Sequence, residues 1–89
     1  MIARDITIVN KLGLHARAAA KLVATASSFG SEIRIGRDAN MTDCKSIMGV
    51  MMLAAGQGSV LKIELEGKDE VRAFAAISAL IDRCFDEGE

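Results

Sequence analysis

The chain has 89 residues, of which 51% are hydrophobic, and its formal net charge is −1. Because this length suits one hydrophobic core, we expect residues 1–89 to form a single domain. Aromatic residues make up only 3% of the chain, without Trp or Tyr, which disfavours a nucleic-acid reader that stacks bases on aromatic rings.

Other broad classes are also disfavoured. No apolar run approaches the ~20 residues that span a bilayer, and the first residues lack a secretory layout, so we expect a cytoplasmic protein without membrane insertion. Cys44 and Cys84 stand apart from any CxxC or Cys/His cluster, which argues against a metal site. Residues 1–59 carry seven Lys/Arg against four Asp/Glu, which suits an acidic partner or a phosphate.

The first half of the sequence predicts a strand, a helix and a hairpin. Alternation of apolar and polar residues predicts a strand at 2–8 with one buried face. After a turn, apolar residues at helical spacing predict a helix that begins at Ala16 and ends before the closing segment 28–30. Further alternation predicts a strand at 32–35 and a weaker return strand at 41–44, joined by a five-residue loop.

The second half predicts a short helix, a strand and a final helix. Ser46 is a candidate N-cap for a helix over 47–53, and 60–66 show the cleanest alternation, with one face toward solvent. Cys84 is expected to be a packed thiol near the edge of the last helix. The buried stripe of this helix is expected to be Val71, Phe74, Ile77, Ile81 and Phe85. The order β-α-β-β-α-β-α predicts an α+β domain, a four-stranded antiparallel sheet with three helices on one face.

The only histidine, His15, stands at the junction between the first strand and the first helix. The first turn of a helix offers backbone N–H groups without intrahelical partners and a partial positive charge, so it accepts anions. Arg17 lies two positions further on, and its planar guanidinium matches a phosphate bidentately. The position of His15 alone fits equally well a capping or solvated residue.

Two sequence strings settle this choice. The string at 11–17 (KLGLHAR), followed by AAKL at 19–22, resembles the active-site signature of the HPr family, the phosphocarriers of the phosphoenolpyruvate-dependent phosphotransferase system. The string at 45–55 (KSIMGVMMLAA) resembles that family's regulatory serine and the helix after it. The resemblance covers nearly the whole chain and implies an open-faced β-sandwich.

The resemblance also implies roles for individual residues. His15 would accept the phosphoryl group through Nδ1, and Arg17 would clamp it. Enzyme I would be the donor and enzyme IIA domains the acceptors, with no cofactor and no enzymatic turnover by this chain itself. The family commonly has Pro where this chain has Ala18, which affects how tightly the helix start is held.

Ser46 and the helix after it allow two interpretations. Ser46 is either a plain N-cap or, as the resemblance implies, a regulatory site for HPr kinase/phosphorylase. We expect Ile47 or Met48 to lie in a partner-docking patch, and the other methionines of this helix, Met51 and Met52, to be core residues.

The leading hypothesis is a monomeric phosphocarrier for sugar uptake and its regulation. A regulatory, nitrogen-related paralogue of the same fold is the first alternative. The second is an α+β module that binds a free anion at the helix start without transferring it.

Overall fold

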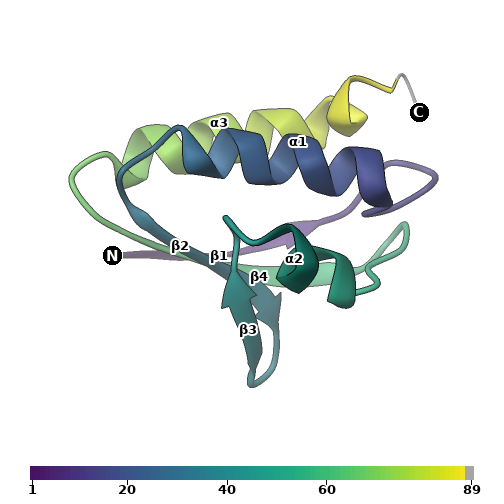
Figure 1. Cartoon of the computed structure of the whole chain (residues 1–89), viewed down its shortest axis with the longest axis horizontal. Helices are drawn as coiled ribbons and strands as arrows, with labels where there is room; N and C mark the ends of the chain where they lie inside the picture. Colours follow the sequence, from purple (N-terminus) through teal and green to yellow (C-terminus); the bar gives the residue numbers. More distant parts are fainter. Residues whose placement is uncertain (88–89) are drawn as a thin grey trace.

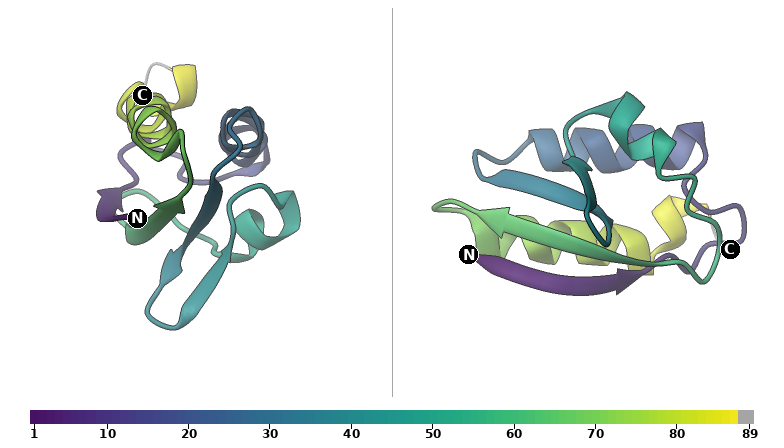
Figure 2. Two further views of the ribbon diagram at one scale, coloured as in Figure 1. Left: turned by 90° about the vertical axis from the view of Figure 1, so that its left-hand side faces the viewer. Right: turned by 90° about the horizontal axis from the view of Figure 1, so that it is seen from below.

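A four-stranded antiparallel sheet carries three α-helices on one face and leaves the other face open (Figures 1 and 2). The structure is a computed structural model that describes residues 1–87. The elements in chain order are β1 (Ile2–Thr7), α1 (Ala16–Ser27), β2 (Glu32–Arg37), β3 (Asn40–Asp43), α2 (Ile47–Met52), β4 (Val60–Glu66), α3 (Glu70–Asp82) and the short 3-10 helix η1 (Cys84–Asp86). The strand order across the sheet is β1-β4-β2-β3. The predicted fold class is confirmed.

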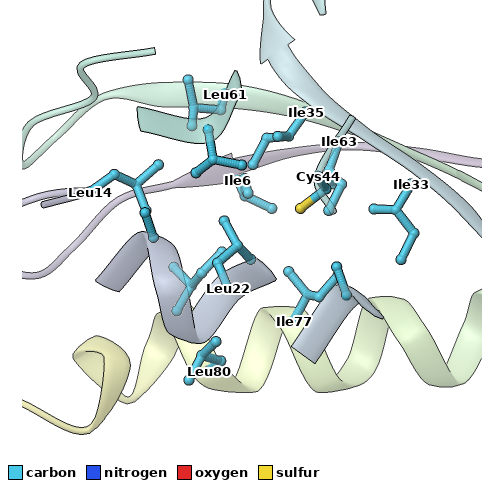
Figure 3. Close-up of a cluster of buried hydrophobic side chains, with 14 of the residues drawn as sticks. Ile6, Leu14, Leu22, Ile33, Ile35, Cys44, Leu61, Ile63, Ile77 and Leu80 are labelled. Atoms are coloured by element: carbon cyan, nitrogen blue, oxygen red, sulfur yellow. The ribbon is translucent and has the colours of Figure 1, made fainter. Parts of the chain in front are cut away.

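The core lies between the inner face of the sheet and the helices (Figure 3). In β4, Leu61, Ile63 and Leu65 are fully buried, whereas Lys62 and Glu66 between and beyond them are exposed, as the alternation predicted. The helices and loops complete the same cluster with Ala19, Leu22, Ala26, Ile77, Leu80 and Phe85 among others. Aliphatic side chains therefore fill one core, which fixes α1 against the sheet.

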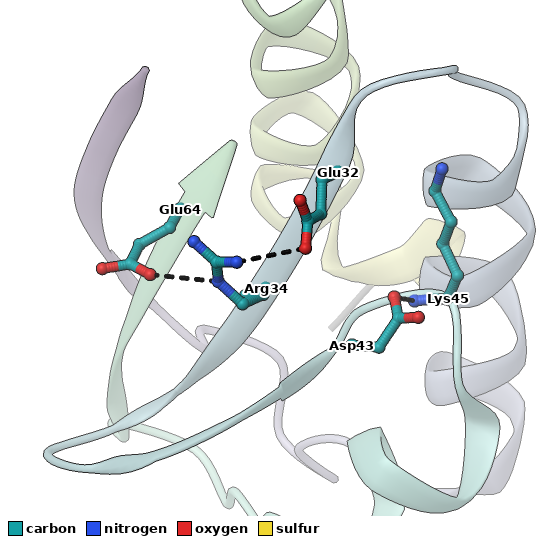
Figure 4. Close-up of polar contacts among 5 residues, drawn as sticks. All are labelled: Glu32, Arg34, Asp43, Lys45 and Glu64. Atoms are coloured by element: carbon teal, nitrogen blue, oxygen red, sulfur yellow. Dashed lines mark hydrogen bonds and ion pairs between the residues drawn. The ribbon is translucent and has the colours of Figure 1, made fainter. Parts of the chain in front are cut away.

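The open face of the sheet is polar and linked by ion pairs (Figure 4). The guanidinium of Arg34 on β2 lies 3.1 Å from the carboxylate of Glu32 and 3.3 Å from that of Glu64 on β4. The pair with Glu64 joins two strands, whereas the pair with Glu32 lies along β2, and both suit a face that water covers. The helices leave this face uncovered.

The β2–β3 hairpin is tighter than the sequence predicted. β2 continues to Arg37 and β3 begins at Asn40, so the loop has two residues rather than five. Gly36, which was placed in the loop, pairs with Met41 inside the ladder. Asp38 has a φ of 53°, a left-handed value that two-residue hairpin loops commonly require. The loop-like composition therefore concealed the ends of both strands.

The buried stripe of α3 was predicted only in part. Val71 is 70% exposed, contrary to the prediction, and the buried residues of the helix are Ala73, Ile77, Leu80 and Ile81. Phe85 is buried as predicted, but it lies in η1, because α3 ends at Asp82 and the chain turns back there. Small Ala73 takes the inward position because it allows close packing of the helix on the sheet. Cys84 is partly buried and lies in η1, just beyond the end of α3.

Candidate functional site

His15 is the N-cap residue of α1, so its ring stands at the positive end of a 12-residue helix. Its backbone is extended, with φ −75° and ψ 177°, and its carbonyl accepts the first helical hydrogen bond from the Ala19 N–H at 2.8 Å. The side chain makes no capping hydrogen bond. The N–H groups of the first turn therefore stay available to an anion bound beside the ring.

The segment before His15 is fastened to the loop that follows α2. The Leu14 N–H donates to the Ala55 carbonyl at 2.8 Å, and the Leu14 side chain is buried. Gly13 has a φ of +67°, and a Cβ there would lie 2.5 Å from the Ala55 oxygen and 2.7 Å from Gly56 Cα. Glycine is required by both the conformation and the close approach of the backbones. This contact sets where the chain enters α1.

A left-handed turn at the C-terminal end brings a second segment to His15. Cys84, Phe85 and Asp86 have φ values of 56°, 54° and 63°, although none of them is glycine. The buried Phe85 ring anchors the turn, and the Lys21 ammonium on α1 donates to the Phe85 carbonyl at 2.6 Å. In Figure 1 this turn lies at the same end of the molecule as the start of α1.

Glu87 follows this turn and contacts the histidine. Its Oε2 lies 2.5 Å from His15 Nε2, and the two side chains are only 13% and 27% exposed. The two atoms are close but are not aligned as a hydrogen bond. The fully buried Asn10 donates from Nδ2 to Glu87 Oε1 at 3.3 Å and to the Gly13 carbonyl at 2.8 Å. Sequence reasoning missed Glu87, because no local pattern marks a contact between opposite ends of the chain.

Arg17 lies beside this cluster but does not contact the histidine. It is exposed, and it forms no ion pair within the part of the chain that the structure describes. Its side chain borders a hollow of about 380 Å³. The lining residues are Lys11, Leu12, Arg17, Lys21, Asp86 and Glu87. Three cationic side chains outnumber the two carboxylates, Asp86 and Glu87, around this hollow, and the excess positive charge suits a phosphoryl group.

Ser46 is the N-cap of α2, as the sequence predicted. Its hydroxyl accepts a hydrogen bond from the Gly49 N–H at 3.2 Å, and the residue is partly exposed. Ile47 and Met48, the expected docking residues, are 38% and 68% exposed.

The expectation for the other methionines of this helix is wrong. Met51 is 41% and Met52 79% exposed, so neither belongs to the core. The buried side chain of α2 is Val50, because a helix of six residues presents only a narrow face to the core.

Other chemistry finds little support in the described residues. Burial raises the pKa of the Cys44 thiol to about 12, which keeps it protonated and unreactive. Within residues 1–87 no three His, Cys, Asp or Glu side chains gather as metal ligands. None of the described helices has the length and apolar character needed to cross a bilayer.

Comparison with known proteins agrees with this arrangement. Residues 2–83 match the family model described as "PTS HPr component phosphorylation site". The phosphocarrier protein HPr of Cupriavidus necator is 55% identical over 89 residues, which is the whole of both chains. The structure of HPr-C-His from Thermoanaerobacter tengcongensis superimposes with a TM-score of 0.93 at 47% identity, covering 98% of each chain. A structure described as an HPr dimer from the same organism has a TM-score of 0.76 at 49% identity, covering 90% of this chain and 92% of that one.

The fold and the histidine together define a small α+β carrier domain with one histidine at a helix N-terminus. The chain belongs to the HPr family, the phosphocarrier proteins of the phosphotransferase system. The resemblance that the two sequence strings carried is thereby confirmed.

Proposed function

We propose that this protein accepts a phosphoryl group from phosphorylated enzyme I onto His15 and passes it to enzyme IIA domains. The observation that carries the proposal is the place of His15 at the N-terminus of α1, beside a hollow lined by Lys11, Arg17 and Lys21. In this proposal residues 1–89 act as one carrier domain that is modified and regenerated, and not as an enzyme with its own turnover.

The geometry suits this transfer because phosphoryl transfer needs positioning and charge stabilisation more than covalent help. A phosphoryl group on the ring would gain hydrogen bonds from the free N–H groups of the first helical turn. Arg17 is exposed and lines the hollow together with Glu87, so its side chain is free to turn toward a phosphoryl group bound there. The helix and the cations would therefore stabilise the phosphorylated form.

We further propose that Ser46 is a regulatory phosphorylation site for an HPr kinase/phosphorylase and that Ile47 and Met48 dock partners. The support is exposure: the Ser46 side chain is partly accessible and the two apolar side chains after it face solvent. The loop after α2 is bonded to the segment before His15, so the end of this helix lies beside the phosphoacceptor. Ser46 stands at the other end of this helix and directly precedes Ile47 and Met48, so a charge on it would act close to these two docking residues.

The same proposal implies where the protein acts, in which oligomeric state, and on which kind of partner. The protein would act in the cytoplasm, where its partners are. It would act as a monomer, because each partner must in turn reach His15. The three positive side chains near His15 favour acidic partner surfaces over nucleic acid.

The test is to incubate the purified protein with phosphoenolpyruvate and enzyme I and then to add an enzyme IIA domain. We expect an acid-labile, base-stable phosphate on the protein, followed by its loss to the enzyme IIA domain. A protein that binds inorganic phosphate reversibly, without covalent labelling, would support the anion-binding module instead.

A further inference from the structure

We propose that Glu87 is a positioning residue that holds the His15 ring with its proton on Nε2, which leaves the lone pair on Nδ1 for the incoming phosphoryl group. The inference deepens the proposed function and depends on it, because it concerns the same phosphoacceptor.

The contact between the two side chains assigns the proton. Glu87 Oε2 lies 2.5 Å from His15 Nε2. A carboxylate accepts hydrogen bonds and cannot donate them, so the ring nitrogen that faces it is the one that carries hydrogen. A small rotation of the ring or of the carboxylate aligns the two groups. In a neutral imidazole the other nitrogen then holds the lone pair, which is the usual way in which a carboxylate fixes a histidine tautomer.

The carboxylate itself is held in place from several directions. Glu87 Oε1 accepts a hydrogen bond from the fully buried Asn10 amide at 3.3 Å, while that amide also donates to the Gly13 carbonyl. The turn before Glu87 is fixed by buried Phe85, whose carbonyl accepts a hydrogen bond from Lys21 on α1. The helix that carries the histidine at its start therefore also anchors the turn that presents the carboxylate.

The transfer step balances without a proton leaving the ring. The Nδ1 lone pair forms the bond to phosphorus, and the bond between phosphorus and the donor atom breaks, with its electron pair staying on the donor. The Nε2 proton stays where it is, so the phosphorylated ring is an imidazolium, and the Glu87 carboxylate compensates its positive charge. In the onward transfer the electron pair of the N–P bond returns to Nδ1, and the starting tautomer is restored.

The experiment uses the single histidine of the chain, which gives one set of imidazole signals. Protein labelled with 15N-histidine is compared as parent, Glu87→Ala and Asp82→Ala at a pH where the ring is neutral, and nitrogen chemical shifts report the tautomer. Asp82→Ala is the matched control, because it removes the same charge from an exposed position at the end of α3, away from the lining of the hollow. Transfer rates from enzyme I are measured on the same three proteins, and melting curves establish that each is folded.

We expect the parent and Asp82→Ala to show the Nε2–H tautomer almost alone, and Glu87→Ala to shift toward the mixture of a histidine in a short peptide. Transfer to Glu87→Ala should be about 10-fold slower, as is typical when an orienting partner of a histidine is removed. An unchanged tautomer or rate in Glu87→Ala, or an equal shift in Asp82→Ala, would overturn the inference. A parent that takes no phosphoryl group would instead overturn the proposed function, and the tautomer measurement does not depend on that result.

Discussion

Asp69 joins the start of α3 to the end of α1 through Ser31. One carboxylate oxygen accepts hydrogen bonds from the Ser31 N–H at 3.0 Å and from the Ser31 hydroxyl, and the other accepts from the Gly30 N–H at 2.9 Å. Ser31 is buried and directly precedes β2. The contact therefore fixes how the two long helices sit on the sheet at the end of the molecule away from His15.

This cluster predicts a pH dependence of stability. The Ser31 hydroxyl, followed by the Gly30 N–H, lowers the pKa of Asp69 from its ordinary value of 3.8. A carboxyl whose pKa is lower in the folded state stabilises the protein above its unfolded pKa, and this contribution is lost as the pH falls through the folded pKa. We expect Asp69→Asn to be less stable than the parent at neutral pH and to lose less of its stability on acidification below 3.8.

Thermal melting from neutral pH to about pH 2 checks this, since the unfolded Asp pKa is about 3.9. Asp5→Asn, which removes the same charge from an exposed position on β1, is the control and should follow the parent. Parallel curves for Asp69→Asn and the parent would show that the cluster does not stabilise the fold through the ionised carboxylate.

Arg17→Lys should slow phosphoryl transfer while leaving the fold unchanged, because Arg17 is exposed and an ammonium cannot bind a phosphate bidentately. Loss of part of a charge-assisted contact worth about 1.5 to 3 kcal/mol corresponds to a rate about 10-fold lower. Single-turnover transfer from enzyme I measures it. Arg72→Lys, on an exposed position of α3, should transfer at the parental rate. If Arg17→Lys and Arg72→Lys accepted the phosphoryl group at equal rates, Arg17 would not be a phosphate-binding residue.

Ser46→Asp should weaken binding to enzyme I without unfolding the protein. Asp is a good N-cap, and negative charge at a helix N-terminus is favourable by about 0.3 to 1 kcal/mol. The new charge lies next to exposed Ile47 and Met48, where docking would desolvate it. Calorimetric titration with enzyme I provides the measurement.

Ser46→Ala is the matched control for this prediction. It removes the hydrogen bond to the Gly49 N–H without adding charge. The loss of the cap should cost about 0.5 to 2 kcal/mol of stability, with enzyme I affinity unchanged. If the alanine variant lost affinity as well, the helix geometry, and not the charge, would control docking.

Ala18→Pro should raise the melting temperature and preserve transfer. Ala18 is the third residue of α1, where the N–H lacks an intrahelical acceptor and the fixed φ of proline is helical. Restricting the unfolded chain at such a position gives about 0.4 to 1 kcal/mol. Melting and phosphohistidine lifetime are measured together. A much shorter lifetime would mean that the Ala18 N–H holds the phosphoryl group, and lower melting would mean that the buried site cannot accommodate the ring.

The elements that were predicted best are those marked by a pattern of neighbouring residues in the sequence. β4 has the predicted bounds because every second residue is apolar, and α1 and α2 begin where the sequence placed their caps, at His15 and Ser46. Periodicity failed at Val71, because the stripe was assigned to large apolar residues, whereas small Ala73 is the buried residue in this part of α3.

Only the part of the candidate site that the N-terminal half of the chain contributes was predictable from the sequence. His15 and Arg17 are marked by their neighbours in the sequence, whereas Glu87 reaches the site through a left-handed turn that contains no glycine. Such a turn has no sequence signature, because tertiary contacts, here the burial of Phe85 and the Lys21 hydrogen bond, stabilise it.

The most direct test of the central claim is labelling of parent and His15→Ala by phosphoenolpyruvate and enzyme I. His15 is the only histidine and its side chain caps no N–H group, so its removal should leave the melting temperature nearly unchanged. We expect the parent to take up one acid-labile phosphoryl group per chain and folded His15→Ala to take up none. Phosphoryl uptake by His15→Ala at the parental level would contradict the assignment of His15 as the phosphoacceptor.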